Sequence, residues 1–204
     1  MKKNILLWMI GAFFFIGDIC LAQAPHQVGG FVLGKDIADY KEMVRMETSL
    51  PIRHMEYLRE VEIKEMEGFK SGLICYGTCE VPGRIVRIKL KYADSTKKFY
   101  KALLERFKER FGEPTEWRGD SFKVVIAWKW SLTDSENNKI SLTLQHNTKD
   151  VEEKMGNSVK LTISNFIEEE RLCFEKRHLE TRERPRKQEE KARGKIDWDR
   201  FVPR

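Results

Sequence analysis

Residues 84–112 read RIVRIKLKYADSTKKFYKALLERFKERFG, in which a strand pattern is followed directly by a helix pattern. Over residues 84–92, apolar and basic side chains alternate, which predicts a half-buried β-strand. Its outward face would carry Arg87, Lys89 and Lys91. In the second part, aromatic and aliphatic residues recur at every fourth position, which predicts an amphipathic helix that ends at Gly112. Because that helix must bury its apolar stripe, we expect it to pack on the sheet that contains the strand.

The same two patterns recur along the rest of the chain. Alternating strands are predicted at 57–66, 69–76, 122–132, 139–147 and 157–164, and further helices at 37–46 and 166–182. Strands joined by short turns pair antiparallel. We therefore expect a two-layer α+β domain, with a mostly antiparallel sheet of about six strands and helices on one face. Residues 84–95 and 157–168 align in pattern at an offset of 73 residues, which suggests a duplicated strand-strand-strand-helix unit.

The N-terminus has the features of a secretory signal peptide. Lys2 and Lys3 precede an apolar run, 5–16, that is too short to anchor the chain in a bilayer. Cleavage after Ala22 would leave Gln23 as the first mature residue. The predicted organisation is a signal peptide at 1–22, a single domain at 23–182 and a charged, flexible tail at 183–204. We expect a periplasmic or secreted protein without a transmembrane anchor after cleavage.

The formal net charge of +6 is unevenly distributed along the chain. Residues 25–175 contain 25 basic and 25 acidic residues, whereas residues 176–204 contain 11 basic and 6 acidic ones. The folded part is therefore neutral, which argues against nucleic acid as a partner. The basic tail favours an anionic surface polymer or an envelope protein instead. It closes in a short apolar island around Trp198, which resembles a docking motif.

Three cysteines remain after signal cleavage, a number that fits one disulfide and one buried thiol in an oxidising compartment. Cys75 lies in an apolar strand pattern, while Cys79 follows a Gly-Thr turn where a bridge is sterically accessible. We favour a Cys79–Cys173 disulfide, which would tie the middle of the chain to the C-terminal helix. A Cys75–Cys79 bridge is the alternative, and it requires a sharp bend at Gly77.

The outward face of the predicted sheet is the main candidate binding surface. It interleaves Ser, Thr and Gln with basic side chains, of which the candidate binding residues are Arg87, Lys89, Lys91, Lys129 and Lys160. Such a face suits a glycan, a lipid headgroup or a partner chain, although one solvated face is also the ordinary state of an antiparallel sheet. Trp117 lies in a predicted loop and is the best candidate for an exposed aromatic side chain.

No residue pattern in the chain specifies a reaction. The four histidines lack metal-ligand spacing, and there is neither a glycine-rich phosphate loop nor a serine nucleophile elbow, so we expect no metal and no cofactor. The leading expectation is a non-enzymatic binding or protein-interaction module of the bacterial envelope. The alternative is an envelope hydrolase that uses His146 with a nearby carboxylate such as Asp150.

Four short runs carry a resemblance to a protein family. They are PGRIVRIK (82–89), RFKERFG (106–112), GEPTEWRGD (112–120) and QHNT (145–148). With the segments around them, these runs resemble an uncharacterised family of exported bacterial proteins, over most of the mature chain. The resemblance implies an exported single-domain protein. Because that family has no established activity, the resemblance supplies no site residues.

Overall fold

The computed structural model describes residues 24–148 and 156–192, with side chains as far as Leu179. The predicted signal peptide at 1–22 lies outside the described residues, as do Asp150 and Trp198.

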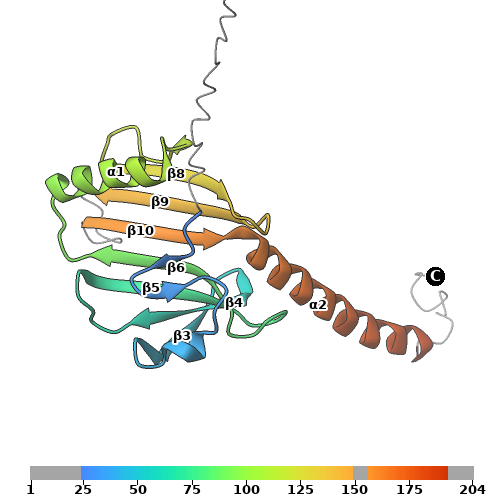
Figure 1. The fold of residues 1–204 in the computed structure, drawn as a ribbon. Helices are drawn as coiled ribbons and strands as arrows, with labels where there is room; N and C mark the ends of the chain where they lie inside the picture. The colour runs from blue at the N-terminus through green and yellow to red at the C-terminus, as the bar shows by residue number, and fades with distance from the viewer. Residues whose placement is uncertain (1–23, 149–155, 193–204) are drawn as a thin grey trace, which may run out of the picture.

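An eight-stranded antiparallel sheet forms the centre of the fold (Figure 1). From one edge to the other its strands are β3 (Val44–Ile52), β4 (Met55–Ile63), β5 (Phe69–Gly77), β6 (Ile85–Tyr92), β10 (Gly156–Ile163), β9 (Lys139–Asn147), β8 (Val125–Thr133) and β7 (Glu116–Trp117). A separate two-stranded ribbon consists of β1 (Gln27–Val28) and β2 (Phe31–Val32). Since the fold combines a mostly antiparallel sheet with two helices, the α+β class expected from the sequence is confirmed.

The two central strands show how the alternation in the sequence creates two different faces. Val86, Ile88 and Leu90 of β6 are fully buried, and their neighbours on β10 are buried with them, namely Val159, Leu161 and Ile163. The alternate positions of these strands project to the other side of the sheet, as a period of two requires. The period therefore separates an apolar core face from a polar outward face, as predicted.

Helix α1 (Lys97–Phe111) covers part of the core face (Figure 1). Thr96 caps its N-terminus by accepting a hydrogen bond from the Phe99 amide at 3.2 Å. The apolar stripe of the helix packs on the core as expected, and the rings of Phe107 and Trp130 meet edge to face with centroids 5.8 Å apart. The indole of Trp130 also donates to the carbonyl of Gly112 at 2.8 Å, which fixes the end of the helix against β8.

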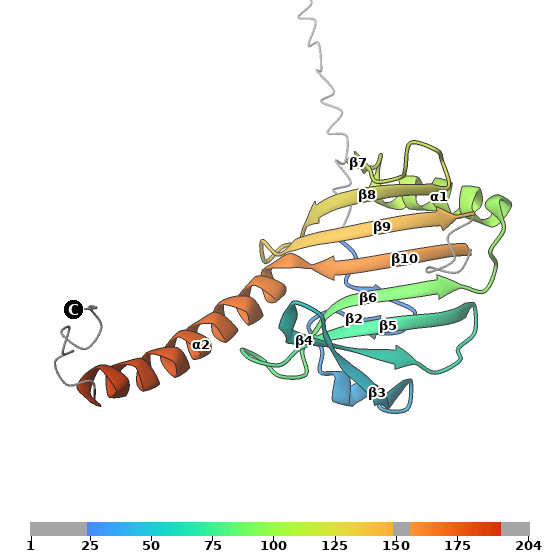
Figure 2. The ribbon, with the colours of Figure 1, turned by 180° about the vertical axis from the view of Figure 1, so that it is seen from behind.

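Helix α2 (Ser164–Ala192) follows β10 without a loop and projects away from the sheet (Figures 1 and 2). Among the side chains described as far as Leu179, those of Phe166, Ile167 and Phe174 attach the helix to the core. Its backbone continues beyond the predicted end at Arg182. The flexibility expected of the tail at 183–204 stays a prediction, and residues 193–204 lie outside the described part of the chain.

The prediction of a helix over 37–46 is wrong. Only Ile37–Tyr40 forms a short 3-10 turn, capped by Asp36, and the chain then enters edge strand β3 at Val44. The spacing of apolar residues looked helical, but the following Thr-Ser-Leu-Pro at 48–51 disfavours a helix, and an edge strand tolerates Pro51. The sheet has eight strands instead of the expected six, because it also contains β3 and the two-residue β7.

The strand order is the same in both halves of the sheet. Each half runs inward from an edge strand, β3 or β7, to a central strand, β6 or β10, that leads into a helix. The suggested duplication stays a prediction, with four strands in each half instead of three.

Candidate functional site

The outward face of the sheet, seen in Figure 2, has no described helix lying across it. There the register places cations side by side: Lys160 of β10 lies opposite Lys89 of β6, and its other neighbour, Thr143 of β9, lies opposite Lys129 of β8. Directly opposed side chains are separated by about 5 Å at Cβ, so two like charges repel there. The row across β6, β10, β9 and β8 is thus basic at three of its four positions.

A hollow of about 430 Å³ opens on this face. Four cationic side chains line it, and they are Arg87, Arg118, Lys129 and Lys160. Its floor is polar and carries hydroxyl and amide groups from β9, β10 and the start of α2, namely Ser141, Thr143, Gln145, Thr162 and Ser164. Guanidinium and ammonium groups above a floor of hydroxyls form a donor-rich surface that suits an anion.

Carboxylates lie at the margin of this basic surface. Glu116 of β7 accepts from Lys129 at 3.4 Å and from the Nε of Arg118 at 2.8 Å. In contrast, the outward positions of β6, β8, β9 and β10 contain no Asp or Glu. Two further carboxylates, those of Glu62 and Glu65, line a second hollow of about 480 Å³ over β4 and β5, together with Lys89 and Lys91. The charged side chains at the outward positions of these four strands are therefore all basic, and the described carboxylates beside them come from β7, from β4 and from the residue Glu65 that follows β4.

The structure brings together five of the seven candidate binding residues. Arg87, Lys129 and Lys160 share the first hollow, and Lys89 and Lys91 line the second. Arg118 belongs to the same surface and was missed, although the alternation in Glu116-Trp117-Arg118 could have shown it as an outward residue.

Trp117 lies apart from this surface. It pairs with Trp128 across β7 and β8, and their rings meet edge to face at 4.8 Å between centroids. Since Trp128 packs on the core, both rings belong to the core side of the sheet edge. Trp117 keeps an exposed fraction of 40% there, so it is exposed as expected but separate from the basic face.

His146 is held inside the domain. It is 4% exposed, and its ring stacks on that of Tyr100 with centroids 5.4 Å apart. Asn157 donates both amide hydrogens to carbonyls, those of Asp94 and Thr96, so its Oδ1 must accept from the Nδ1–H of His146 at 2.7 Å. The imidazole therefore links two strands to the start of α1, a geometry that lends no support to a hydrolase site.

The cysteines confirm the favoured pairing. Cys79 and Cys173 form a disulfide with Cα atoms 5.9 Å apart, and Cys75 is a buried free thiol, so the Cys75–Cys79 alternative is wrong. Burial raises the pKa of the Cys75 thiol to about 12, which leaves it neutral and unreactive at physiological pH.

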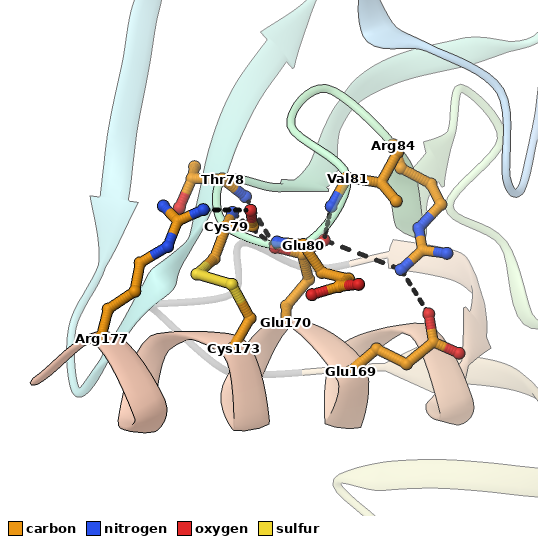
Figure 3. Close-up of polar contacts among 9 residues, drawn as sticks. All are labelled: Thr78, Cys79, Glu80, Val81, Arg84, Glu169, Glu170, Cys173 and Arg177. Carbon is orange, nitrogen blue, oxygen red and sulfur yellow. Dashed lines mark hydrogen bonds and ion pairs between the residues drawn. A yellow bond between two sulfur atoms is a disulfide. The ribbon is translucent and has the colours of Figure 1, made fainter. Parts of the chain in front are cut away.

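A buried carboxylate reinforces the disulfide (Figure 3). Glu170 of α2 is completely buried and accepts four backbone N–H bonds from loop 78–81, at 2.6–3.1 Å. Converging backbone amides of this kind form an anion-binding concavity. No local pattern in the sequence indicates this role of Glu170, because the loop that surrounds its carboxylate lies about ninety residues earlier in the chain.

Two arginines complete the attachment of α2 (Figure 3). Arg84 contacts Glu169 at 2.6 Å and Glu170 at 3.7 Å, and its guanidinium lies 4.0 Å from the centre of the Phe166 ring. Arg177 donates to the carbonyl of Cys79 at 3.1 Å. We call Glu170, the Cys79–Cys173 disulfide, Arg84 and Arg177 the helix clamp. Each of its side chains is engaged within the fold, so the clamp serves as a structural attachment that fixes the direction of α2.

Comparison with protein-family models, with curated proteins and with solved structures found no match. The family resemblance seen in the sequence stays a prediction. Within 24–148 and 156–179, no three His, Cys, Asp or Glu side chains gather closely enough to hold a metal ion. No helix in the described part of the chain combines the length and apolar character that a membrane span requires. The basic face, formed by Arg87, Lys89, Lys91, Arg118, Lys129 and Lys160 on the outward side of the sheet, is therefore the candidate functional site.

Proposed function

We propose that the protein is an exported, non-enzymatic binding module of the bacterial envelope, and that it holds an anionic partner on the outward face of its sheet. One observation carries this proposal: four cationic side chains line one hollow above a floor of hydroxyl and amide groups. Charge-assisted hydrogen bonds from such groups are about twice as strong as neutral ones, and arginine can bind an oxyanion with two parallel bonds.

The distribution of charge supports the same proposal. Although residues 25–175 are neutral in total, the charged residues at the outward positions of β6, β8, β9 and β10 are all basic. Lys89 and Lys160 lie opposite each other in the register of β6 and β10, so an anion bound between them would interact with both ammonium groups.

Export is supported by the N-terminal sequence and by the disulfide. Disulfides persist in the periplasm and outside the cell, and they are rare in the reducing cytosol. The basic residues of 183–204 would add long-range attraction to an anionic envelope surface.

The test is co-sedimentation of the mature chain with envelope fractions at low and at high salt. Arg87→Gln, Lys129→Gln and Lys160→Gln, introduced together, remove three charges from the hollow and should abolish most of the salt-sensitive binding. The matched control removes three exposed lysines from α1, on the opposite side of the sheet, by Lys97→Gln, Lys98→Gln and Lys101→Gln.

Both triple variants have the same net charge, so a difference between them reports the place of the charges. Equal binding by the two variants and the wild type would contradict the proposal, as would an equal loss in both. Circular dichroism spectra and melting curves of both variants establish that each one is folded.

A further inference from the structure

The geometry of the basic face points to a particular class of ligand: we infer that the face binds an extended chain of phosphate groups, not a single compact anion. This inference rests on the proposed function and names the chemistry of its ligand. It follows from how widely the cations are spread, from their order along the rows of the sheet, and from the groups between them.

The first argument is the span of the cations across the strands. Arg118 directly follows β7, and its backbone pairs with Ala127 of β8. The opposed positions on the next three strands are Gln145 of β9, Ser158 of β10 and Lys91 of β6, so these five residues form one row across the sheet. That row crosses four gaps between strands of about 4.8 Å each, or about 19 Å in all. A hydrogen bond to an anion requires contact within about 3 Å. One phosphate therefore reaches only a fraction of this surface, whereas a chain of phosphates can follow it.

The second argument is the span along the strands. On β6, Arg87, Lys89 and Lys91 occupy successive outward positions, at about 6.8 Å per two residues. Lys89 lies opposite Lys160, which lines the first hollow, while Lys89 and Lys91 line the second. The row of cations on β6 therefore connects the two hollows, and the carboxylates of the second hollow, Glu62 and Glu65, come from β4 and from the residues that follow it.

The lining of the first hollow indicates which kind of polyanion it can bind. The described residues that line the first hollow include no aromatic side chain, so it offers no platform on which a sugar ring or a base could stack. Its neutral donors are small hydroxyl and amide groups, and two of its four cations are arginines. Arginine forks and hydroxyl donors match the several oxygens of a phosphate group, and they recognise charge and spacing without reading the rest of the ligand.

The test compares long-chain inorganic polyphosphate with tripolyphosphate, both titrated into the mature chain over a series of salt concentrations. If Arg87, Lys89, Lys91, Lys129 and Lys160 each neutralise one phosphate, log K should fall against log salt with a slope of about −3.5, taking about 0.7 per phosphate on a single chain. Affinity for polyphosphate should then drop by about 100-fold between about 50 and 200 mM salt. Tripolyphosphate should bind more weakly and give a shallower slope.

Single variants sharpen the test. Lys160→Gln, at the centre of the surface, and Lys91→Gln, toward one end of the row on β6, should each reduce the polyphosphate slope by about 0.7. Lys98→Gln on α1 is the matched control and should leave the slope unchanged. Because the slope counts displaced ions, a variant that merely loosened the fold would not lower it by one phosphate.

Equal affinities and equal slopes for polyphosphate and tripolyphosphate would overturn the inference and indicate a compact anion site. Absence of binding by both phosphates would overturn it as well. In both cases the proposed function is tested separately by co-sedimentation with envelope fractions. That experiment uses the natural partner and no phosphate probe, and the triple variants report whether binding depends on the hollow.

Discussion

Replacing Glu170 tests how α2 is held against the sheet. Its carboxylate accepts four backbone N–H bonds and has no exposed surface, so Glu170→Ala leaves four donors of loop 78–81 without their partner. Hydrogen bonds to a charged group contribute about 1.5–3 kcal/mol each, but water entering the vacated space would recover part of that sum. Loss of one partner from a buried charged pair typically costs about 3–5 kcal/mol. We expect the free energy of unfolding to fall by about 4 kcal/mol.

Glu170→Gln separates the charge from the shape of the side chain. Oε2 accepts from Thr78, Cys79 and Glu80, and an amide oxygen can keep those three bonds. The amide nitrogen would then face the N–H of Val81, so two donors would meet. We expect a loss of about 2 kcal/mol, between wild type and Glu170→Ala, because one bond fails and the others lose the ionic contribution.

The assay is urea unfolding of the mature chain without reductant, followed by circular dichroism. Glu169→Ala is the matched control: Glu169 is the preceding residue of α2 and pairs with Arg84, but its side chain is 45% exposed. An exposed ion pair contributes about 0–1 kcal/mol, so this variant should unfold close to the wild type. If Glu170→Ala also costs less than about 1 kcal/mol at an unchanged denaturant slope, the four bonds do not stabilise the fold as argued.

Three further predictions concern the same region of the molecule. A Cβ on Gly77 would lie 2.4 Å from the Glu170 carboxyl carbon, so Gly77→Ala should cost about 1–3 kcal/mol in urea unfolding, and much less when Glu170→Ala is also present. The Cys79–Cys173 disulfide joins residues 94 apart in the sequence. Replacing both cysteines by serine should lower the free energy of unfolding by up to about 4.7 kcal/mol, the value expected from the entropy of closing such a loop. An unchanged urea midpoint would contradict that account. Burial raises the pKa of Cys75 to about 12 from 9.0, so the folded chain keeps a proton that the unfolded chain loses, and stability should fall as pH rises through that window. Cys75→Ala should reduce this alkaline loss, and iodoacetamide should modify Cys75 at neutral pH only after unfolding.

Local patterns in the sequence predicted the parts of the fold that depend on periodicity. Alternation at 84–92 and at 157–164 separated core from outward residues correctly, because successive side chains of a strand point to opposite faces of the sheet. The four-residue spacing at 97–111 gave α1 and its buried stripe. The same reasoning failed at 37–46, where too few residues were available to distinguish a helix from a turn followed by an edge strand.

The helix clamp could not be predicted, because it depends on contacts between distant parts of the chain. Three successive glutamates at 168–170 look equivalent in the sequence, yet only Glu170 is buried. The difference arises from the angle at which α2 leaves β10 and from the position of loop 78–81, neither of which a local pattern specifies. The choice of Cys79 and Cys173 succeeded because it needed only a turn next to one cysteine and a helix around the other.

The basic face could be predicted only in part. Alternation alone predicts that Lys89 and Lys160 project outward, but it does not predict that they face each other. That depends on the register of β6 against β10, two strands separated by α1 and three further strands, with no tight turn between them to set it. A slip of one residue would place Lys89 opposite an apolar residue of β10 and would turn Val159 and Leu161 out of the core, so burial of these side chains enforces the register. The packing of one face thus brings like charges together on the other, and the proposed binding of an anionic ligand depends on this arrangement.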